Sequence, residues 1–247
     1  MPNIRIWTLE SENDAKAVEC LANKLVTHLQ LGNLSIQVVG PRAIPKQNKK
    51  GASPSDILGM AVQNYLKQDA CVIFVIDSDG LMSSHQRRQE PNSLINQITR
   101  VVKDRRFTGK VFLAQAVQEL EAWLLIDCLG IFCYFASKIA QYRENCRDRV
   151  SANQSFMRLI GSYQKGDTEK IVEAEIGGRG AKEYLIEFSK KILPALNPNK
   201  TLRNITREQY RESLSPEVAE HVLIDQHTLR RNNSLSELGN LLNQFGE

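Results

Sequence analysis

The sequence predicts an α/β fold: a Rossmann-like parallel sheet with helices on both faces, followed by a C-terminal helical region. Three observations support this prediction. The first half alternates strand-like and helix-like segments, residues 70–76 form an unbroken apolar run, and the strand signal ends after about residue 129. An unbroken apolar run is typical of a central strand buried on both faces of a parallel sheet. Successive strand–helix units then favour a three-layer core with right-handed crossovers.

Each expected element rests on its own pattern of apolar residues. A strand is expected at 4–9, and residues 18–29 carry the apolar stripe of a helix that lies on a sheet. A second strand is expected at 34–39, and Pro54 is well placed to begin a second helix. The remaining elements of this half are the strand at 70–76, a helix over 94–102, a strand at 111–114 and a helix over 117–129.

The second half carries helical patterns only. Helices are expected over 130–160, 180–195, 205–224 and 234–245, separated by a glycine-rich segment and a segment that contains two prolines. The expected domains are therefore an α/β core at 1–129 and a helical region at 130–247 packed on that core.

Composition excludes several classes of protein. The net charge of +4 is spread evenly over both halves, so it permits a local nucleic-acid contact without indicating one. No apolar run reaches the ~18 residues of a membrane span, and no signal sequence follows Met1, so a cytoplasmic location is expected. The five cysteines show no C-x-x-C spacing, and we expect reduced thiols instead of disulfides or a zinc site.

Acidic residues follow two of the expected strands. Glu10 and Asp14 come after the first strand, and Asp77 and Asp79 come after the third. Ligands bind at the carboxyl ends of parallel strands, so these groups share one edge of the sheet if the two strands are neighbours. Hard oxygen ligands favour Mg²⁺ or Mn²⁺. The sequence therefore predicts a metal site formed by Glu10, Asp14, Asp77 and Asp79.

Structural explanations compete for some of these acids. Asp79-Gly80 is a common turn pair, and Asp14 stands three residues after Ser11, where it suits a capping box at a helix start. Glu121 lies near the start of the helix expected after the fourth strand. Its apolar neighbours make it a candidate catalytic acid, although an acid near a helix N-terminus also favours the helix dipole.

These motifs resemble the TOPRIM family. That family places a glutamate after its first strand and an Asp-x-Asp after a later one, which here are Glu10 and Asp77-Ser78-Asp79, with Ser11 where a glycine is usual. The segment 121–127 is similar to the E-x-W-L-L-x-D signature of a narrower TOPRIM-like group of unknown function. Lys182, Tyr210 and Arg230-Arg231 are similar to later elements of that group.

The resemblance implies a function. Glu10 would be a general acid/base or a metal contact, and Asp77 and Asp79 would hold Mg²⁺. The implied activity is phosphodiester hydrolysis of DNA or RNA, as in nucleases of the overcoming-lysogenization-defect type. The genes of the narrower group often stand beside AAA-type ATPase genes in bacterial defence loci, so an ATPase partner and a role in antiviral defence are also implied. No tyrosine is placed like a topoisomerase nucleophile, which favours hydrolysis over religation.

Basic residues near the same edge are candidates for contacts to nucleic acid, because phosphates require positive charge. Each candidate also has an explanation without nucleic acid: the residue lies in a solvated loop or, for Lys182, follows a glycine-rich segment that is a flexible linker. The candidates are Lys46, Lys49, Lys50, Arg87, Arg88 and Lys182.

Two other functions stay open. Asp77-Ser78-Asp79-Gly80 also fits the D-x-D-G motif of haloacid-dehalogenase phosphatases, with Asp77 as nucleophile and Asp79 as acid/base, although that motif normally follows the first strand and leaves Glu10 without a role. A regulatory or binding subunit with a degenerate acidic site is the third possibility.

Overall fold

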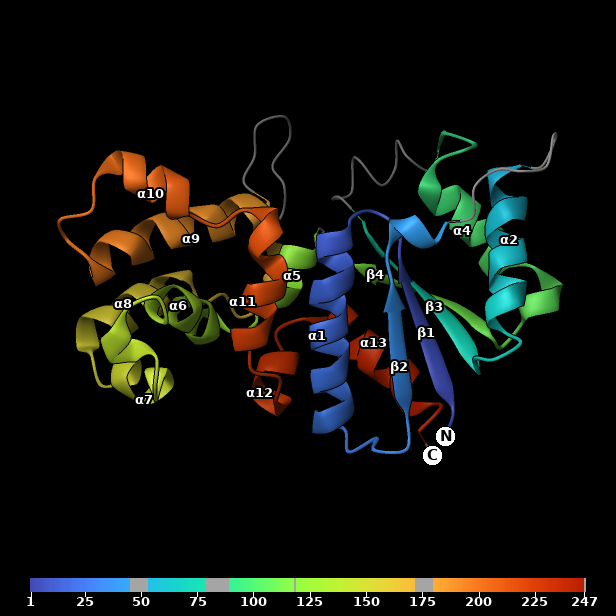
Figure 1. The fold of residues 1–247 in the computed structure, drawn as a ribbon, viewed down its shortest axis with the longest axis horizontal. Helices are drawn as coiled ribbons and strands as arrows, with labels where there is room; N and C mark the ends of the chain where they lie inside the picture. Colours follow the sequence, from blue (N-terminus) through green and yellow to red (C-terminus); the bar gives the residue numbers. More distant parts are fainter. Residues whose placement is uncertain (45–52, 79–88, 118, 172–179, 247) are drawn as a thin grey trace. The chain divides into compact units, whose positions relative to one another are not determined.

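The computed structural model describes residues 1–44, 53–78, 89–117, 119–171 and 180–246 (Figure 1). The chain divides into two compact units. Unit 1 consists of Met1–Val117 together with Ser234–Glu247, and unit 2 consists of Gln118–Asn233. This division differs from the expected boundary at residue 129, because the chain leaves the sheet about twelve residues earlier and its last helix belongs with the sheet.

Unit 1 contains the predicted parallel sheet. Within the described residues it has four strands in the order β2-β1-β3-β4, and all neighbours are parallel. The α/β prediction is therefore confirmed. The strands are β1 (Asn3–Thr8), β2 (Ser35–Val39), β3 (Cys71–Asp77) and β4 (Val111–Ala116).

Helices lie on both faces of this sheet. Helix α1 (Glu12–His28) lies on one face, and α2 (Pro54–Tyr65) and α4 (Leu94–Val102) lie on the other (Figure 1). Helix α13 (Asn233–Asn243) packs beside α1, since Leu25 and Leu29 lie 3.4 Å from where a side chain on Gly239 would begin. The predicted helical coverage of both faces is confirmed.

Local sequence explains where the helices of unit 1 begin. The Ser11 hydroxyl accepts a hydrogen bond from the Asp14 N–H and so caps α1. At α2, Ser53 and Asp56 form a reciprocal capping box and Pro54 occupies the first turn. Such caps satisfy backbone N–H groups that have no partner within the helix.

The core on the α2 and α4 side is aromatic in its centre. The Trp7 ring stacks on Phe74 with centroids 5.5 Å apart and meets the edge of Tyr65 at 5.3 Å. Helix α4 contributes Ile98, which is fully buried. Burying one such side chain is worth about 1.5–3 kcal/mol, so this packing holds the strand ends, and the residues that follow them, in fixed positions.

Unit 2 is helical, as predicted, and the helix expected over 180–195 is confirmed as Ala181–Leu196, but the other expected helices are divided into shorter ones. The expected helix over 117–129 is two helices, because the Asp127 carboxylate accepts the Gly130 N–H at 3.0 Å and begins a new helix. The expected helices over 130–160 and 205–224 are also interrupted. The helices are α5 (Leu120–Leu124), α6 (Cys128–Ala136), α7 (Cys146–Ser151), α8 (Gln154–Tyr163), α9 (Ala181–Leu196), α10 (Leu202–Glu208), α11 (Ser215–His221) and α12 (Gln226–Leu229).

One prediction about the cysteines is wrong. Cys133 in α6 and Cys146 in α7 form a disulfide, with their Cα atoms 5.8 Å apart. The two helices bring these cysteines together across 13 residues of sequence, which their spacing alone does not reveal. Cys71 and Cys128 are buried thiols, as predicted, and burial raises the pKa of each to about 12.

None of the helices in the described parts of the chain combines the length and the apolar character that crossing a membrane requires.

Candidate metal centre and a buried acid cluster

The carboxyl ends of β1 and β3 meet at a topological switch point of the sheet. These strands are neighbours, yet the chain leaves β1 for α1 on one face, whereas α4, the helix between β3 and β4, lies on the other (Figure 1). Connections that diverge in this way open a crevice, and ligands of open α/β sheets bind there. Glu10 and Asp77 are the acids that stand at this point.

Glu10 and Asp77 are in direct contact. The backbone N–H of Asp77 donates a hydrogen bond to the Glu10 carboxylate, with N and Oε2 2.9 Å apart. The strand register explains the contact: Thr8 pairs with Val75, so the residues two positions further along each chain come level with one another. The structure therefore brings together one acid from each of the two predicted motifs.

Asp77 is held from the other side as well. It is the last residue of β3 and pairs with Ala116 of β4, and the N–H of Ser78 extends this pairing to the Ala116 carbonyl at 2.9 Å. Asp77 is partly buried, whereas Glu10 is exposed. The arrangement fixes the backbone of Asp77 between β4 and the Glu10 carboxylate, at the exposed edge of the sheet.

The other acids near Glu10 have contacts that belong to local structure. Asp14 lies in the first turn of α1, where its backbone N–H donates to the cap Ser11, while a capping role for its carboxylate stays a prediction. Glu12 accepts the N–H of Arg42 at 3.1 Å, and glycine at position 40 provides the space, since a Cβ there would come 2.7 Å from Glu12 Oε2.

The donor chemistry of the Glu10–Asp77 pair suits a hard cation. Mg²⁺ is usually held by only one or two carboxylates together with water and substrate phosphates. Within the described residues, no group of three histidine, cysteine, aspartate or glutamate side chains is arranged to hold a metal ion. Asp79, the fourth predicted ligand, lies outside the described residues. The role of the full set, Glu10, Asp14, Asp77 and Asp79, stays a prediction.

Unit 2 contains a different acidic feature centred on Glu121. This side chain is 5% exposed, and the Tyr210 hydroxyl, itself fully buried, donates to its Oε1 at 2.9 Å. The Tyr210 hydroxyl also lies 2.6 Å from the Ser215 hydroxyl. Burial raises the pKa of Glu121 to about 7, although the Tyr210 hydrogen bond opposes the shift. Glu121 can therefore exchange a proton near neutral pH.

Lys182 and two further glutamates complete this Glu121 cluster. The Lys182 N–H donates to Glu119 Oε2 at 2.8 Å, and its ammonium group donates to Glu212 Oε2 at 3.0 Å. Desolvation lowers the pKa of Lys182, but Glu212, Glu121 and Glu119 outweigh it, so the pKa is raised and the ammonium stays charged. The ion pair with Glu212 gives Lys182 a partner within unit 2, while its predicted contact with nucleic acid stays untested.

Three of the residues singled out by the resemblance thus meet in unit 2: Glu121, Lys182 and Tyr210. Tyr210 lies between α10 and a short 3₁₀ turn at Glu212–Leu214, not within a helix as expected. Arg231 is buried, and its Nε donates to the Lys165 carbonyl at 2.7 Å, so it ties two segments of backbone together.

Several predicted contacts lie outside the described residues. They are Lys46, Lys49, Lys50, Arg87 and Arg88.

Some members of the Glu121 cluster were missed in the sequence. Glu119 and Glu212 have no motif that distinguishes them from surface acids, and Ser215 sits at an ordinary helix start. The one sequence signal for this cluster is that two acids, Glu119 and Glu121, come directly before the apolar run at 122–126.

Comparison of the chain with protein-family models, with curated proteins and with solved structures gives no match.

Proposed function

We propose that this protein is a metal-dependent phosphodiesterase acting on nucleic acid, with its reaction centre at Glu10 and Asp77. One observation carries the proposal: the Glu10 carboxylate accepts the N–H of Asp77 at 2.9 Å, at the switch point between β1 and β3. The contact joins the Glu10 carboxylate to the backbone of Asp77, so each of two neighbouring strands contributes one acid to a ligand-binding edge, where a cation can compensate their charge.

The two side chains would have different duties. Asp77, anchored at the end of a central strand, would hold Mg²⁺ or Mn²⁺ together with Asp79. Such an ion stabilises negative charge on a phosphate and makes water a better nucleophile. Glu10 is exposed and held by a backbone N–H, so it can take a proton from water or return one to a leaving oxygen.

The resemblance to TOPRIM-like proteins supports the same chemistry. In that family a glutamate after the first strand and an aspartate after a later strand serve one reaction centre, as we propose for Glu10 and Asp77. The resemblance also adds three parts to the proposal: a DNA or RNA substrate, an AAA-type ATPase partner and a role in antiviral defence. A phosphatase of the haloacid-dehalogenase type would use Asp77 and Asp79 but would leave Glu10 idle. The contact between Glu10 and Asp77 therefore favours the phosphodiesterase.

The test is a cleavage assay with the full chain. Plasmid DNA, single-stranded RNA and a phosphate monoester are incubated with Mg²⁺ or Mn²⁺ and with wild type, Glu10→Gln or Asp77→Asn. We expect cleavage of nucleic acid to fall about 10²–10⁴-fold in Glu10→Gln, the range for loss of a general acid or base. Asp77→Asn should lose activity to a similar extent.

The matched control is Glu19→Gln, an exposed acid on α1, and it should cleave as wild type does. Hydrolysis of the monoester that requires Asp77 but not Glu10 would contradict the proposal and favour the phosphatase. Metal-dependent cleavage that survives in both Glu10→Gln and Asp77→Asn would contradict it as well.

A further inference from the structure

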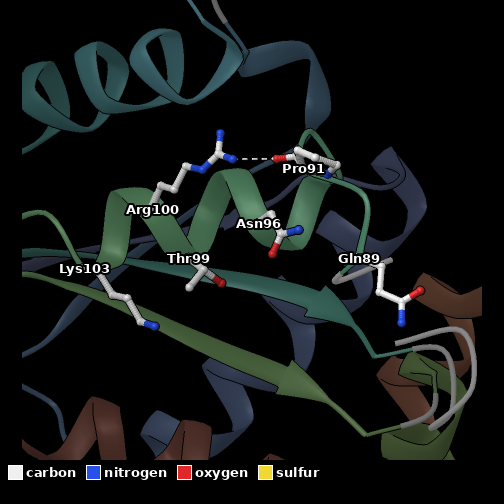
Figure 2. Close-up of a pocket in the computed structure, with 6 residues that line it drawn as sticks. All are labelled: Gln89, Pro91, Asn96, Thr99, Arg100 and Lys103. Carbon is white, nitrogen blue, oxygen red and sulfur yellow. Dashed lines mark hydrogen bonds between the residues drawn. The ribbon is translucent and has the colours of Figure 1, made fainter. Parts of the chain in front are cut away.

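A groove runs between α4 and the edge strand β4 in unit 1 (Figure 2). It consists of a hollow of about 570 Å³ and an adjoining one of about 350 Å³, which share three lining residues. Leu113 and Gln115 of β4 line the second hollow. We call this the α4–β4 groove; its first hollow is lined by Gln89, Pro91, Asn96, Thr99, Arg100 and Lys103.

The groove is polar and positively charged. Among the described residues, its lining includes Arg100 and Lys103 but no aspartate or glutamate. The two basic residues are three positions apart on α4, so they are neighbours on its exposed surface, while Ile98 on the opposite face is buried in the core. Asp104, the acid next to Lys103 in sequence, is paired with Arg106 at 2.6 Å.

The basic groups are placed to meet a ligand. Arg100 Nη2 donates to the Pro91 carbonyl at 2.8 Å, and both residues line the first hollow (Figure 2). A guanidinium has five N–H donors, so this bond leaves others for an anion. Lys103 is exposed, and within the described parts of the chain its ammonium group forms no ion pair.

Gln115 adds a polar donor to the groove. Its Nε2 is buried and has no hydrogen-bond partner among the described residues. Buried polar groups in native proteins are almost always satisfied, so such a group calls for an explanation. A ligand that presents an acceptor oxygen in the second hollow would supply the missing partner.

The groove also leads toward the proposed reaction centre. Gln115 pairs with Ile76, and the next pair along the two strands is Ala116 with Asp77. Neighbouring strands lie about 4.8 Å apart, so the groove reaches the edge of the sheet one strand away from Asp77. From Asn96 to Lys103 the helix advances about 10 Å along the groove.

From these features we infer that the α4–β4 groove binds the backbone of a nucleic-acid strand, with Arg100 and Lys103 on its phosphates and Gln115 on one of its oxygens. The choice of a nucleic acid as the polyanion rests on the proposed function. The groove delivers the strand to the edge at which Asp77 stands.

Binding is measured separately from cleavage. Fluorescence anisotropy of a labelled 20-nucleotide DNA or RNA strand is followed in EDTA, which prevents metal-dependent hydrolysis, at several salt concentrations. We expect Arg100→Gln/Lys103→Gln to weaken binding at least tenfold. Each lost phosphate contact should also make the slope of log K against log salt shallower by about 0.7 for a single strand. Gln115→Leu should weaken binding without changing this slope.

The control is Lys16→Gln, which removes an exposed lysine from α1 on the other face of the sheet. It should bind as wild type does, and the thermal melting of all variants should match wild type. Failure of the wild-type protein to bind any strand would overturn the inference. Equal binding by wild type and the double variant, or equal weakening by Lys16→Gln, would also overturn it.

The experiment separates this inference from the proposed function. Strand binding that depends on Arg100 and Lys103, in a protein that cleaves nothing with Mg²⁺ or Mn²⁺, supports the groove and contradicts the phosphodiesterase. If cleavage requires Glu10 but the double variant of Arg100 and Lys103 binds the strand as wild type does, the phosphodiesterase is supported and the inference that the groove binds nucleic acid is overturned.

Discussion

Glu121 shows how a single buried carboxyl group makes stability depend on pH. Its pKa is about 7 in the folded protein, against 4.5 as its ordinary value, because burial disfavours the charged form. Below pH 4.5 the group is protonated in both states. As the pH rises from 4.5 to 7 the unfolded chain releases this proton first, so stability falls through that window. At 1.36 kcal/mol per pKa unit the loss amounts to about 3 kcal/mol.

The variant Glu121→Gln tests this account. Its amide oxygen can still accept from Tyr210, but it has no charge to bury. We expect its free energy of unfolding to exceed that of wild type by up to about 3 kcal/mol at pH 8 and to match it near pH 4.5. Urea denaturation in a Trp7→Phe background measures this, because Trp123 of α5 then reports on unit 2 alone. Parallel pH profiles of the two proteins would contradict the account.

The two basic residues of the α4–β4 groove, Arg100 and Lys103, could not be recognised as a binding site from the sequence. Glu10 and Asp77 could be found because each follows a recognisable strand, and strand ends gather ligands. Arg100 and Lys103 follow no motif, and two basic residues on one helix surface look the same as any solvated face. What distinguishes them is the pair of hollows that they line and, beside these, the Gln115 amide, which has no hydrogen-bond partner among the described residues.

The disulfide between α6 and α7 has a consequence at the level of elements. It closes a short loop, since its cysteines are 13 residues apart. Closing a loop of this size restricts the unfolded chain and contributes about 3 kcal/mol in the chain-entropy model. We expect a reductant to lower the melting temperature of wild type but not that of Cys133→Ser/Cys146→Ser.

Alkylation of the unfolded, unreduced protein checks the bond itself. Three of the five cysteines should react, namely Cys20, Cys71 and Cys128. Reaction of all five would contradict the disulfide, and Cys20→Ser, which leaves the bond intact, serves as the control for the melting measurement.

The helices of unit 1 and helix α9 of unit 2 could be predicted, whereas the breaks within the other expected helices of unit 2 could not, for a physical reason. The start of helix α2 can be recognised in the sequence from a local capping box and a proline in its first turn. The break between α5 and α6 depends on Asp127, which caps α6 and also accepts the N–H of Leu223 at 2.7 Å, 96 residues away. A partner so distant in sequence leaves no periodic signal in the segment that it interrupts.

At the scale of unit 1 as a whole, the order of the strands in the sheet determines whether Glu10 and Asp77 lie close enough to form a site. The acids of the first and third strands could meet only if those strands were neighbours, which local pattern does not determine. The crossover through α2 carries the chain past β1 and sets β3 beside it. The last helix was predicted at 234–245, but its packing with the sheet could not be predicted for a similar reason, since Phe245 packs on Phe112 of β4, far away in the sequence, with centroids 5.7 Å apart.

The central claim is that Glu10 and Asp77 form part of one cation site, and manganese binding tests it most directly. Free Mn²⁺ is followed by electron paramagnetic resonance during titration of the full chain. We predict one site in wild type that Mg²⁺ displaces, at least tenfold weaker binding in Asp77→Asn and in Glu10→Gln, and unchanged binding in Glu19→Gln. Equal Mn²⁺ affinity in all four proteins, or no Mn²⁺ bound by wild type, would contradict the claim.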